Sequence, residues 1–541
     1  MTLLFDRIKQ KPHVWLLFLI MLIAECVVWP QGEFPLNDDW SYTWSAKWLY
    51  MHGDIRIGDW PAMTLWSHLV WGLLFLKVFG FSFFILRFSM MVAAFISLRL
   101  LLKIIGKRSD MHSGLAAAIT LLSCPIFFNL ANTYMTDISF IMFAIAAVYA
   151  ASRFFEEGQT LHFILVFIFS ILLTLVRQYG VVLPIAFTFA CMFRRIPTRF
   201  SAVLFGVIGI GITIAILKFY ESYLKTTLND HSAYRFTGKL DPFSRVFYDY
   251  LLENLIVRFR WISEYTLTFA GPFCLFILPT LVRRYKLYIS LPIVAFAIAI
   301  CFYLYQTVKF PLGNICENMN VGAETFVESL SNDYRYGRQP HTYSATFDAI
   351  GIFTGSLMSG ITVGTLLLLM PSVRVKKIRT NPLNIMLLSF MLLYMLLLLI
   401  TDSFFDRYLL PLPMLLMVLV SGPAGAGKST LPAFTVMAIF LTFSVLGTKD
   451  YFTLNHTRWN IYNETMKTYN LTYNEVNGGF EPNSWEGGRY NHWMTFLDPP
   501  RYPYLIQYNP VEGFTEIKAY PFKRWLTNSV DTLKLYKRNT P

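Results

Sequence analysis

The sequence predicts an all-α membrane bundle of about thirteen transmembrane helices, with a small α/β domain at its C-terminal end outside the membrane. Composition is the first reason, because 55% of the 541 residues are hydrophobic, 15% are charged and the mean hydropathy is +0.46. A water-soluble fold needs more polar side chains than this to cover its surface. The second reason is that the apolar residues come in blocks of about 17–25, the length of helix that crosses a hydrocarbon layer.

The predicted spans begin with an uncleaved first helix. Arg7, Lys9 and Lys11 precede an apolar run that no small-residue cleavage site follows, so we expect a membrane helix rather than a signal peptide. The thirteen predicted spans are 13–30, 83–105, 111–130, 138–155, 161–177, 179–193, 199–219, 263–282, 287–306, 348–370, 381–401, 405–420 and 430–447.

The block 62–80 determines the sidedness of every later loop. If it lies in the outer interface instead of crossing, about eighteen basic residues fall on the side of the N-terminus, and the short loops opposite carry only a couple. The cytoplasmic segments are then 103–108, 153, 194–199, 283–286, 374–379 and Lys428. This asymmetry also accounts for most of the net charge of +13 without nucleic-acid binding.

Four segments then lie outside: 31–82, 220–262, 307–347 and the region from about 448. We therefore divide the chain into a transmembrane domain, 1–447, with interfacial helices in 31–82, and an extracytoplasmic domain, 448–541. The six cysteines are scattered, several of them inside apolar runs, and indicate neither a disulfide framework nor a metal cluster.

Two adjacent carboxylates, Asp38 and Asp39, follow the first span. Tryptophans then recur every fourth residue, which predicts a helix lying flat on the outer leaflet with an aromatic stripe of Trp40, Trp44 and Trp48 at the headgroups. Asp38 and Tyr42 fall on the side of the helix away from that stripe. The alternative is that one of the two acids simply caps the helix.

Further polar residues stand at the outer ends of later spans. Asp137 opens one span, where capping is again the simpler interpretation. Arg177 and Arg407 lie at two more outer ends, where a guanidinium group could hold a phosphate or merely anchor its helix by reaching the interface.

Taken together, these motifs resemble the GT-C class of polytopic glycosyltransferases, in particular the bacterial relatives of the protein O-mannosyltransferases and the lipid A aminoarabinose transferases. The resemblance runs over most of the chain, and the thirteen spans and the outside C-terminal domain match as well. Its motifs are Asp38-Asp39-x-x-Tyr42, Gly58-Asp59-Trp60, Thr136-Asp137, Leu175-x-Arg177-Gln178 and Asp406-Arg407-Tyr408-Leu-Leu-Pro411.

The resemblance implies transfer of a sugar from a polyprenyl-phosphate carrier to an acceptor on the outer side. It makes Asp38 the general base, while Asp39 and Asp137 shape the acceptor pocket or help to hold a divalent metal ion. The donor-binding residues that it implies are Tyr42, Arg177, Gln178, Arg407 and Tyr408. One departure is that relatives carry Lys-Pro-Pro where this chain has Trp60-Pro61-Ala62, which leaves the contacts to the donor phosphate open.

Gly422 to Thr430 matches the P-loop pattern G-x-x-x-x-G-K-[ST] at every position. A P-loop works between a buried strand and a helix of an α/β domain, whereas this segment joins two apolar spans. We therefore expect a tight cytoplasmic loop that binds no ATP.

The rival class is a transporter or flippase of lipid-linked glycans, which predicts charged or Gly/Pro-broken positions near the bilayer midplane and an internal repeat. The spans are mostly free of such charges, and the two halves do not repeat. We therefore predict a glycosyltransferase of hexosyl or pentosyl type in a bacterial inner membrane. Its acceptor would be a lipid, a glycan or a protein, and its N-terminus would be cytoplasmic and its C-terminus extracytoplasmic.

Overall fold

The structure is a computed structural model, and it describes most of the chain. The described ranges are 12–58, 60–61, 63–193, 198–227, 245–306, 315–319, 345–372, 381–401, 404–425, 427, 431–487 and 502–539. Asp59 of the Gly-Asp-Trp motif, Lys428 to Thr430 of the P-loop-like segment and most of the predicted outside segment 307–347 lie beyond them.

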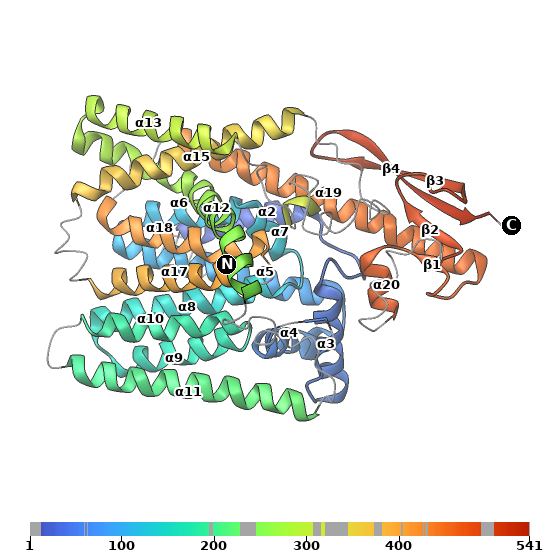
Figure 1. The fold of residues 1–541 in the computed structure, drawn as a ribbon, viewed down its shortest axis with the longest axis horizontal. Helices are drawn as coiled ribbons and strands as arrows, with labels where there is room; N and C mark the ends of the chain where they lie inside the picture. Colours follow the sequence, from blue (N-terminus) through green and yellow to red (C-terminus); the bar gives the residue numbers. More distant parts are fainter. Residues whose placement is uncertain are drawn as a thin grey trace, which may run out of the picture.

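Helices make up most of the fold, as predicted (Figure 1). In chain order they are α2 (Pro12–Val28), α3 (Asp39–His52), α4 (Trp66–Phe79), α5 (Phe83–Arg108), α6 (Met111–Ser123), α7 (Pro125–Ala131), α8 (Thr136–Glu157), α9 (Thr160–Thr174), η1 (Gln178–Val181), α10 (Val182–Cys191), α11 (Thr198–Thr227), α12 (Arg245–Tyr285), α13 (Leu287–Tyr305), α14 (Ile315–Asn318), α15 (Ala345–Leu369), η3 (Met370–Ser372), α17 (Pro382–Ile400), η4 (Asp406–Leu409), α18 (Pro411–Ala424), α19 (Leu431–Tyr469) and α20 (Phe480–Gly487).

Each of the thirteen predicted spans falls on one of these helices or on a pair of them. Within the described ranges, nine helices are long and apolar enough to cross a membrane, and the bent pair α6–α7 makes a tenth candidate. The remaining three predicted spans are the shorter apolar helices α2, α9 and α10. The fourth short apolar helix is α4, the segment that we assigned to the interface.

The bend between α6 and α7 measures 73° and has a local cause. Cys124 takes an extended backbone conformation, which the following Pro125 favours because its ring crowds the helical region of the preceding residue. After the bend, a short turn leads into α8, and Asp137 lies in the first turn of that helix.

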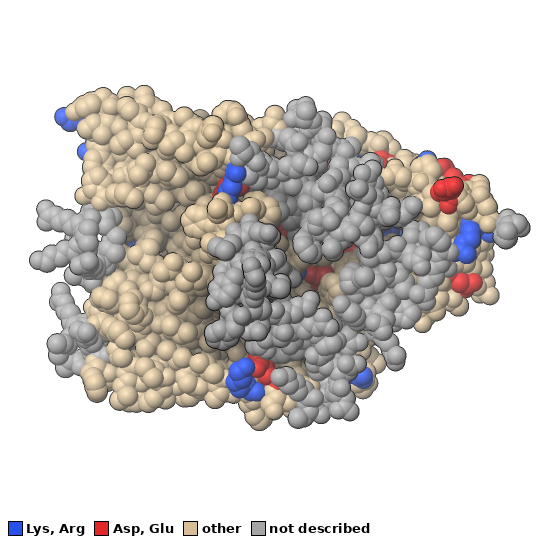
Figure 2. Space-filling model, in the orientation of Figure 1, with Lys and Arg blue, Asp and Glu red and all other residues tan. Residues whose placement is uncertain are grey.

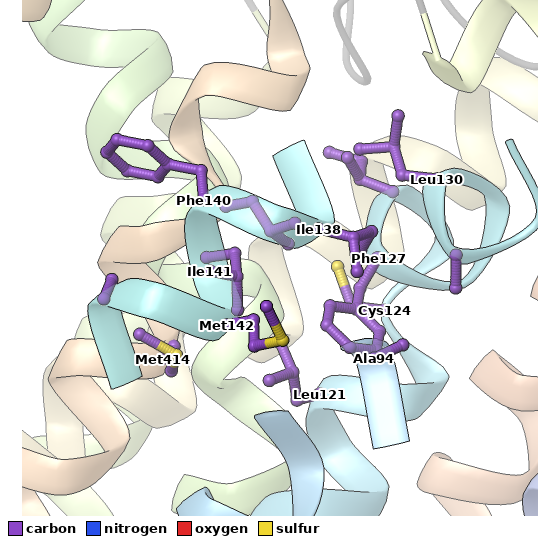
Figure 3. Packing of buried hydrophobic residues seen from close by; sticks show 14 of the residues in the cluster. Ala94, Leu121, Cys124, Phe127, Leu130, Ile138, Phe140, Ile141, Met142 and Met414 are labelled. Carbon is purple, nitrogen blue, oxygen red and sulfur yellow. The ribbon is translucent and has the colours of Figure 1, made fainter. Parts of the chain in front are cut away.

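The bundle packs around a continuous apolar core. Figure 3 shows part of it, where Leu121 of α6, Phe127 of α7, Met142 of α8 and Met414 of α18 are all buried. Toward the outside, the face in Figure 2 shows few charged side chains over the described surface of the bundle, as a lipid-facing surface requires.

Helix α3 runs across the end of the bundle instead of along it (Figure 1). α3 packs on α4, and α20 packs on α3. This crosswise placement agrees with the predicted interfacial helix and puts Asp38 and Asp39 at the end of the bundle that carries the C-terminal region.

The C-terminal region contains a four-stranded sheet in the order β1-β2-β4-β3. Its strands are β1 (Val476–Asn477), β2 (Tyr504–Gln507), β3 (Phe514–Arg524) and β4 (Ser529–Arg538); β1 pairs parallel with β2, and the other two pairings are antiparallel. The sheet fits the small α/β domain that the sequence predicts. α19 runs without a break through residues 447 and 448, so the last span and the start of the C-terminal region share one helix.

Candidate active site

The loop that leads to Asp38 is tied to the bundle by a buried arginine. Arg87 of α5 donates hydrogen bonds to the carbonyl oxygens of Pro30, Gly32 and Phe34. Three carbonyl groups that lie outside any helix are thereby satisfied, which a loop against an apolar bundle requires. The Asp-Asp motif therefore starts from a fixed position.

Asp38 makes contacts to two distant segments of the chain. Its carboxylate accepts a hydrogen bond of 2.9 Å from the indole Nε1 of Trp60 and forms a 2.8 Å ion pair with Nη2 of Arg407. It occupies the position before the first residue of α3, yet its side chain makes no capping hydrogen bond. The capping interpretation is therefore wrong for Asp38, since the side chain is committed to tertiary contacts.

Asp39 has a different environment, although it is the next residue. It is 1% exposed, and its two carboxylate oxygens accept the backbone N–H groups of Leu36, at 2.5 Å, and Tyr134, at 3.1 Å. Burial raises the pKa of Asp39 to about 7, while the nearby Arg87 charge and these two hydrogen bonds act in the opposite direction. Asp39 thus joins the loop before α3 to the turn before α8.

A second ion pair joins Asp137 and Arg177, with 2.9 Å between Oδ1 and Nη2. Arg177 also donates to the hydroxyl of Thr136 from Nε, at 2.9 Å, and from Nη2, at 2.6 Å. The other carboxylate oxygen of Asp137 is buried without a hydrogen-bond partner. Capping does not describe Asp137, because its side chain points to an arginine 40 positions away along the chain.

Tyr408 brings the two ion pairs together. The guanidinium groups of Arg177 and Arg407 lie 4.9 Å and 5.5 Å from the centre of its ring, and the hydroxyl of Tyr394 fixes its carbonyl at 2.9 Å. Both arginines are buried, at 4% and 3% exposure, so neither reaches water as an anchoring side chain would. Two arginines and two carboxylates therefore form one compact, charge-balanced cluster.

Tyr42 and Gln178 border this cluster. Tyr42 is 1% exposed, and burial, together with the neighbouring Asp38 charge, holds the pKa of its hydroxyl well above the usual value. It is therefore a neutral hydrogen-bond donor at physiological pH. Gln178 is buried at the start of η1, next to Arg177.

The structure also adds residues to which the sequence gave no role. The indole of Trp60 packs 5.8 Å from the ring of Phe480 and 6.3 Å from that of Trp40. Glu481 accepts a 3.3 Å hydrogen bond from the backbone N–H of Asn37 and pairs with Arg458 at 3.1 Å. The start of α20 thus contacts Trp60 and Asn37, which are respectively a partner and a chain neighbour of Asp38. No local pattern links residues so far apart in the sequence.

The predicted headgroup-facing tryptophan stripe is wrong at its first member. Trp40 is buried beneath Phe480 and Trp60, whereas Trp44 and Trp48 are half-buried, stack on each other at 5.6 Å and lie beside Arg56. The C-terminal region covers the first turn of α3, and the helical pattern could not show this.

The carboxylates of this cluster are a poor fit for the divalent metal ion considered above. Across the ranges that the structure describes, no group of three or more His, Cys, Asp and Glu side chains could hold a metal ion. Asp38 and Asp137 each face a guanidinium group, whose charge would oppose a divalent cation. We therefore derive no step through a metal.

Comparison with known proteins finds one family whose model matches part of the chain. Residues 62–219 match the family described as dolichyl-phosphate-mannose-protein mannosyltransferase. The predicted resemblance to GT-C glycosyltransferases is confirmed. The match extends from before α4 into α11 and includes Asp137, Arg177 and Gln178, while Asp38 and Arg407 lie outside it.

Two solved structures of ArnT from Cupriavidus metallidurans are also similar to the chain. The apo form has 12% sequence identity and a TM-score of 0.45, with 98% of each chain covered. The form bound to undecaprenyl phosphate has 11% identity and a TM-score of 0.43, with 97% of this chain and 98% of that one covered. No curated protein matches the sequence.

The structure shows what Trp60 contacts, at the position where the sequence departs from the Lys-Pro-Pro motif. The indole of Trp60 donates a hydrogen bond of 2.9 Å to the carboxylate of Asp38. Asp38 thus has one neutral donor, Trp60, and one cationic partner, Arg407.

The described part of the P-loop-like segment begins inside a helix and contacts two neighbouring helices. Its first three residues, 422–424, form the end of helix α18 and not of a strand. The carbonyl oxygens of Pro423 and Gly425 accept hydrogen bonds from Arg284, at 3.3 Å, and Ser109, at 2.6 Å. These contacts pack the segment against the ends of α12 and α5.

Proposed function

We propose that the protein is a glycosyltransferase that moves a sugar from a polyprenyl-phosphate-linked donor to an acceptor hydroxyl or amine. The observation that carries the proposal is the cluster of two carboxylate–guanidinium pairs against the ring of Tyr408, at the end of the bundle beside α3. The family match at residues 62–219 supports the same reaction class.

Asp38 is the base in this proposal. Two of its lone pairs are occupied by Trp60 and Arg407, and each carboxylate oxygen keeps a further lone pair for an acceptor proton. As the acceptor attacks the anomeric carbon, its proton passes to Asp38, and the bond from that carbon to the phosphate oxygen breaks. General-base assistance of this kind is worth about 10²–10⁴ in rate.

Arg177 and Arg407 bind the phosphate of the donor. Both are already desolvated, so a phosphate that enters the cluster meets preorganised cations and not mobile, hydrated ones. Tyr42 and Gln178 supply neutral donors at its edge, and Asp137 orients Arg177. The lipid tail of the donor would lie along the bundle, which explains why the site is built at a membrane surface.

We assign the cluster to the extracytoplasmic face of a bacterial inner membrane, with the N-terminus inside and the C-terminus outside. The support is the positive-inside asymmetry, which puts the basic loops at the opposite end of the bundle. The transferred group would be a hexose or pentose, and the acceptor a lipid, a glycan or a protein.

The first test is transfer by the purified protein in lipid nanodiscs, with polyprenyl-phosphate-linked mannose and aminoarabinose as donors. Asp38→Asn should lower transfer about 10²–10⁴-fold with donor binding retained, because the amide keeps the size of the side chain but not its basic oxygen. Arg407→Ala should instead weaken donor binding.

Asp110→Asn is the matched control. Asp110 caps α6 by accepting the N–H of Ser113 at 2.6 Å, and asparagine caps a helix about as well as aspartate. This variant should stay fully active. A fully active, folded Asp38→Asn protein would remove Asp38 from the mechanism.

A further inference from the structure

The turn between β3 and β4 is fastened to the last membrane helix. Asp450 of α19 accepts the backbone N–H groups of Trp525 and, at 3.1 Å, Leu526. The hairpin therefore points its turn back toward the bundle, while its other end leads to the C-terminus (Figure 1). Because the carboxylate of Asp450 accepts both of these N–H groups, the hairpin turn has a defined position against α19; we call this contact the junction.

The junction lies where α19 leaves the bilayer. The helix is apolar from Leu431 to Gly447, and Lys449 stands about 27 Å from its start at 1.5 Å per residue, close to the thickness of a hydrocarbon layer. Lys449 follows Thr435, Ala438 and Thr442 at helical spacing, and these three residues are exposed. It thus emerges on the face of α19 that is turned toward lipid.

Basic and apolar side chains meet on the exposed side of this junction. The ammonium groups of Lys449 and Lys523 lie 3.9 Å and 4.4 Å from the centre of the Trp525 ring. Val530, which pairs with Lys523 across the hairpin, is 72% exposed, and Trp525 is 38% exposed. An exposed tryptophan and valine flanked by two lysines match the depth at which apolar acyl chains give way to phosphates.

We infer that Lys449, Lys523, Trp525 and Val530 form a membrane-surface anchor, which binds the anionic phosphates of lipid headgroups and holds the C-terminal region on the bilayer. The two lysines bind the phosphates, and Trp525 and Val530 enter the headgroup layer. Positive charge, exposed apolar area and depth along α19 all favour a bilayer as the occupant over a soluble partner.

The test uses the full chain and phosphatidylglycerol as the probe, with phosphatidylcholine for comparison, in native mass spectrometry of the detergent-solubilised protein. The double variant Lys449→Gln/Lys523→Gln should retain less phosphatidylglycerol, by roughly fivefold for each lysine removed. Lys518→Gln/Lys534→Gln is the matched control, because these lysines of the same hairpin already pair with Glu464 and Glu516. The control should bind as the unchanged protein does.

The position of the β3–β4 turn relative to the bilayer is tested separately. Spin labels are attached to single cysteines in a Cys26→Ser background, and the protein is placed in nanodiscs. A label at Thr527→Cys should be accessible to oxygen and shielded from a water-soluble nickel complex, whereas one at Thr515→Cys, at the far end of the hairpin, should be accessible to nickel. Equal nickel accessibility at both positions would overturn the anchor. Equal loss of phosphatidylglycerol in both double variants would also overturn it, because net charge alone would then explain binding.

Discussion

Asp39 shows how burial and hydrogen bonding oppose each other on one carboxyl group. Burial favours its neutral form, whereas the N–H groups of Leu36 and Tyr134 favour its carboxylate. Burial is the larger effect, and the pKa of Asp39 rises from 3.8 to about 7. Asp38, one residue earlier, has a guanidinium partner instead. Two adjacent acids thus have different environments: Asp39 links two segments, and Asp38 is the one that we propose as the base.

The raised pKa of Asp39 predicts a pH dependence of stability. Between pH 4 and 7 the folded protein keeps a proton on Asp39 that the unfolded chain releases, so stability should fall as pH rises through this window and level off above it. Thermal unfolding in detergent, compared with Asp39→Asn at each pH, isolates this effect because the variant has no carboxyl to titrate. A pH-independent difference between the two proteins would contradict it.

Among the helices, α13 and α15 approach each other closely because of two glycines. A Cβ atom at Gly360 would lie 2.4 Å from Cα of Ile298, and one at Gly364 would lie 3.0 Å from Cα of Val294. Glycines four residues apart on one face allow membrane helices to bring their backbones together. Helix contact here depends on backbone proximity, since lipid provides little hydrophobic force between helices.

Gly360→Ala should destabilise the bundle by about 1–3 kcal/mol, because backbone atoms cannot move aside as a flexible side chain can. Gly211→Ala is the control, since nothing lies within 4 Å of a Cβ atom there. That change should be neutral or slightly stabilising through helix propensity. Thermal unfolding of both variants in the same detergent measures the difference, and equal melting temperatures would refute the packing argument.

Helix α20 contacts the residue before Asp38, so we expect a change in α20 to affect the catalytic rate. Asn37 adopts a left-handed backbone with φ of 52°, and Glu481 fixes its N–H one residue before Asp38. Glu481→Ala should lower kcat roughly tenfold to hundredfold with donor KM unchanged, since it misplaces the base without touching the phosphate site. Glu481→Gln should retain most activity, because its amide oxygen can still accept the bond.

Glu464→Ala provides the comparison for α20. Glu464 pairs with Lys518 on the exposed surface of the same region, so its loss removes a glutamate without reaching Asp38. Its kcat should match that of the unchanged protein. If Glu481→Ala raises donor KM and leaves kcat intact, Glu481 does not position Asp38.

For the whole molecule, the charge asymmetry predicts which end faces which compartment. In intact bacterial cells with Cys26→Ser, a cysteine at Asn474 should react with an impermeant maleimide, and one at Lys286 should react only after the membrane is opened. Lys286 lies between α12 and α13, and Asn474 lies between α19 and β1. These two connections are at opposite ends of the molecule (Figure 1). Labelling of Lys286→Cys from outside would reverse the assignment and move the Asp38 cluster to the cytoplasm.

Much of this molecule could be predicted because the bilayer imposes simple local rules. A span must be a run of apolar residues, and its backbone must satisfy its own hydrogen bonds. All thirteen predicted spans therefore fall on helices, and the crosswise helix α3 was predicted from its tryptophans. Position alone left Asp38 and Asp137 open to capping and Arg177 and Arg407 open to anchoring, and the resemblance to GT-C glycosyltransferases is what implied a shared site for them.

What the sequence alone determined, then, is the membrane bundle and the residue types available at one end of it. Only the tertiary structure decided the pairs, since Asp38 meets Arg407 across 369 positions and Asn37 meets Glu481 across 444. It also gave Asp38 and Asp39 different hydrogen-bond partners and buried Trp40 beneath α20. Such contacts depend on how helices pack and on which segment closes over them. A local pattern sets the face of a helix but not the neighbour that covers it.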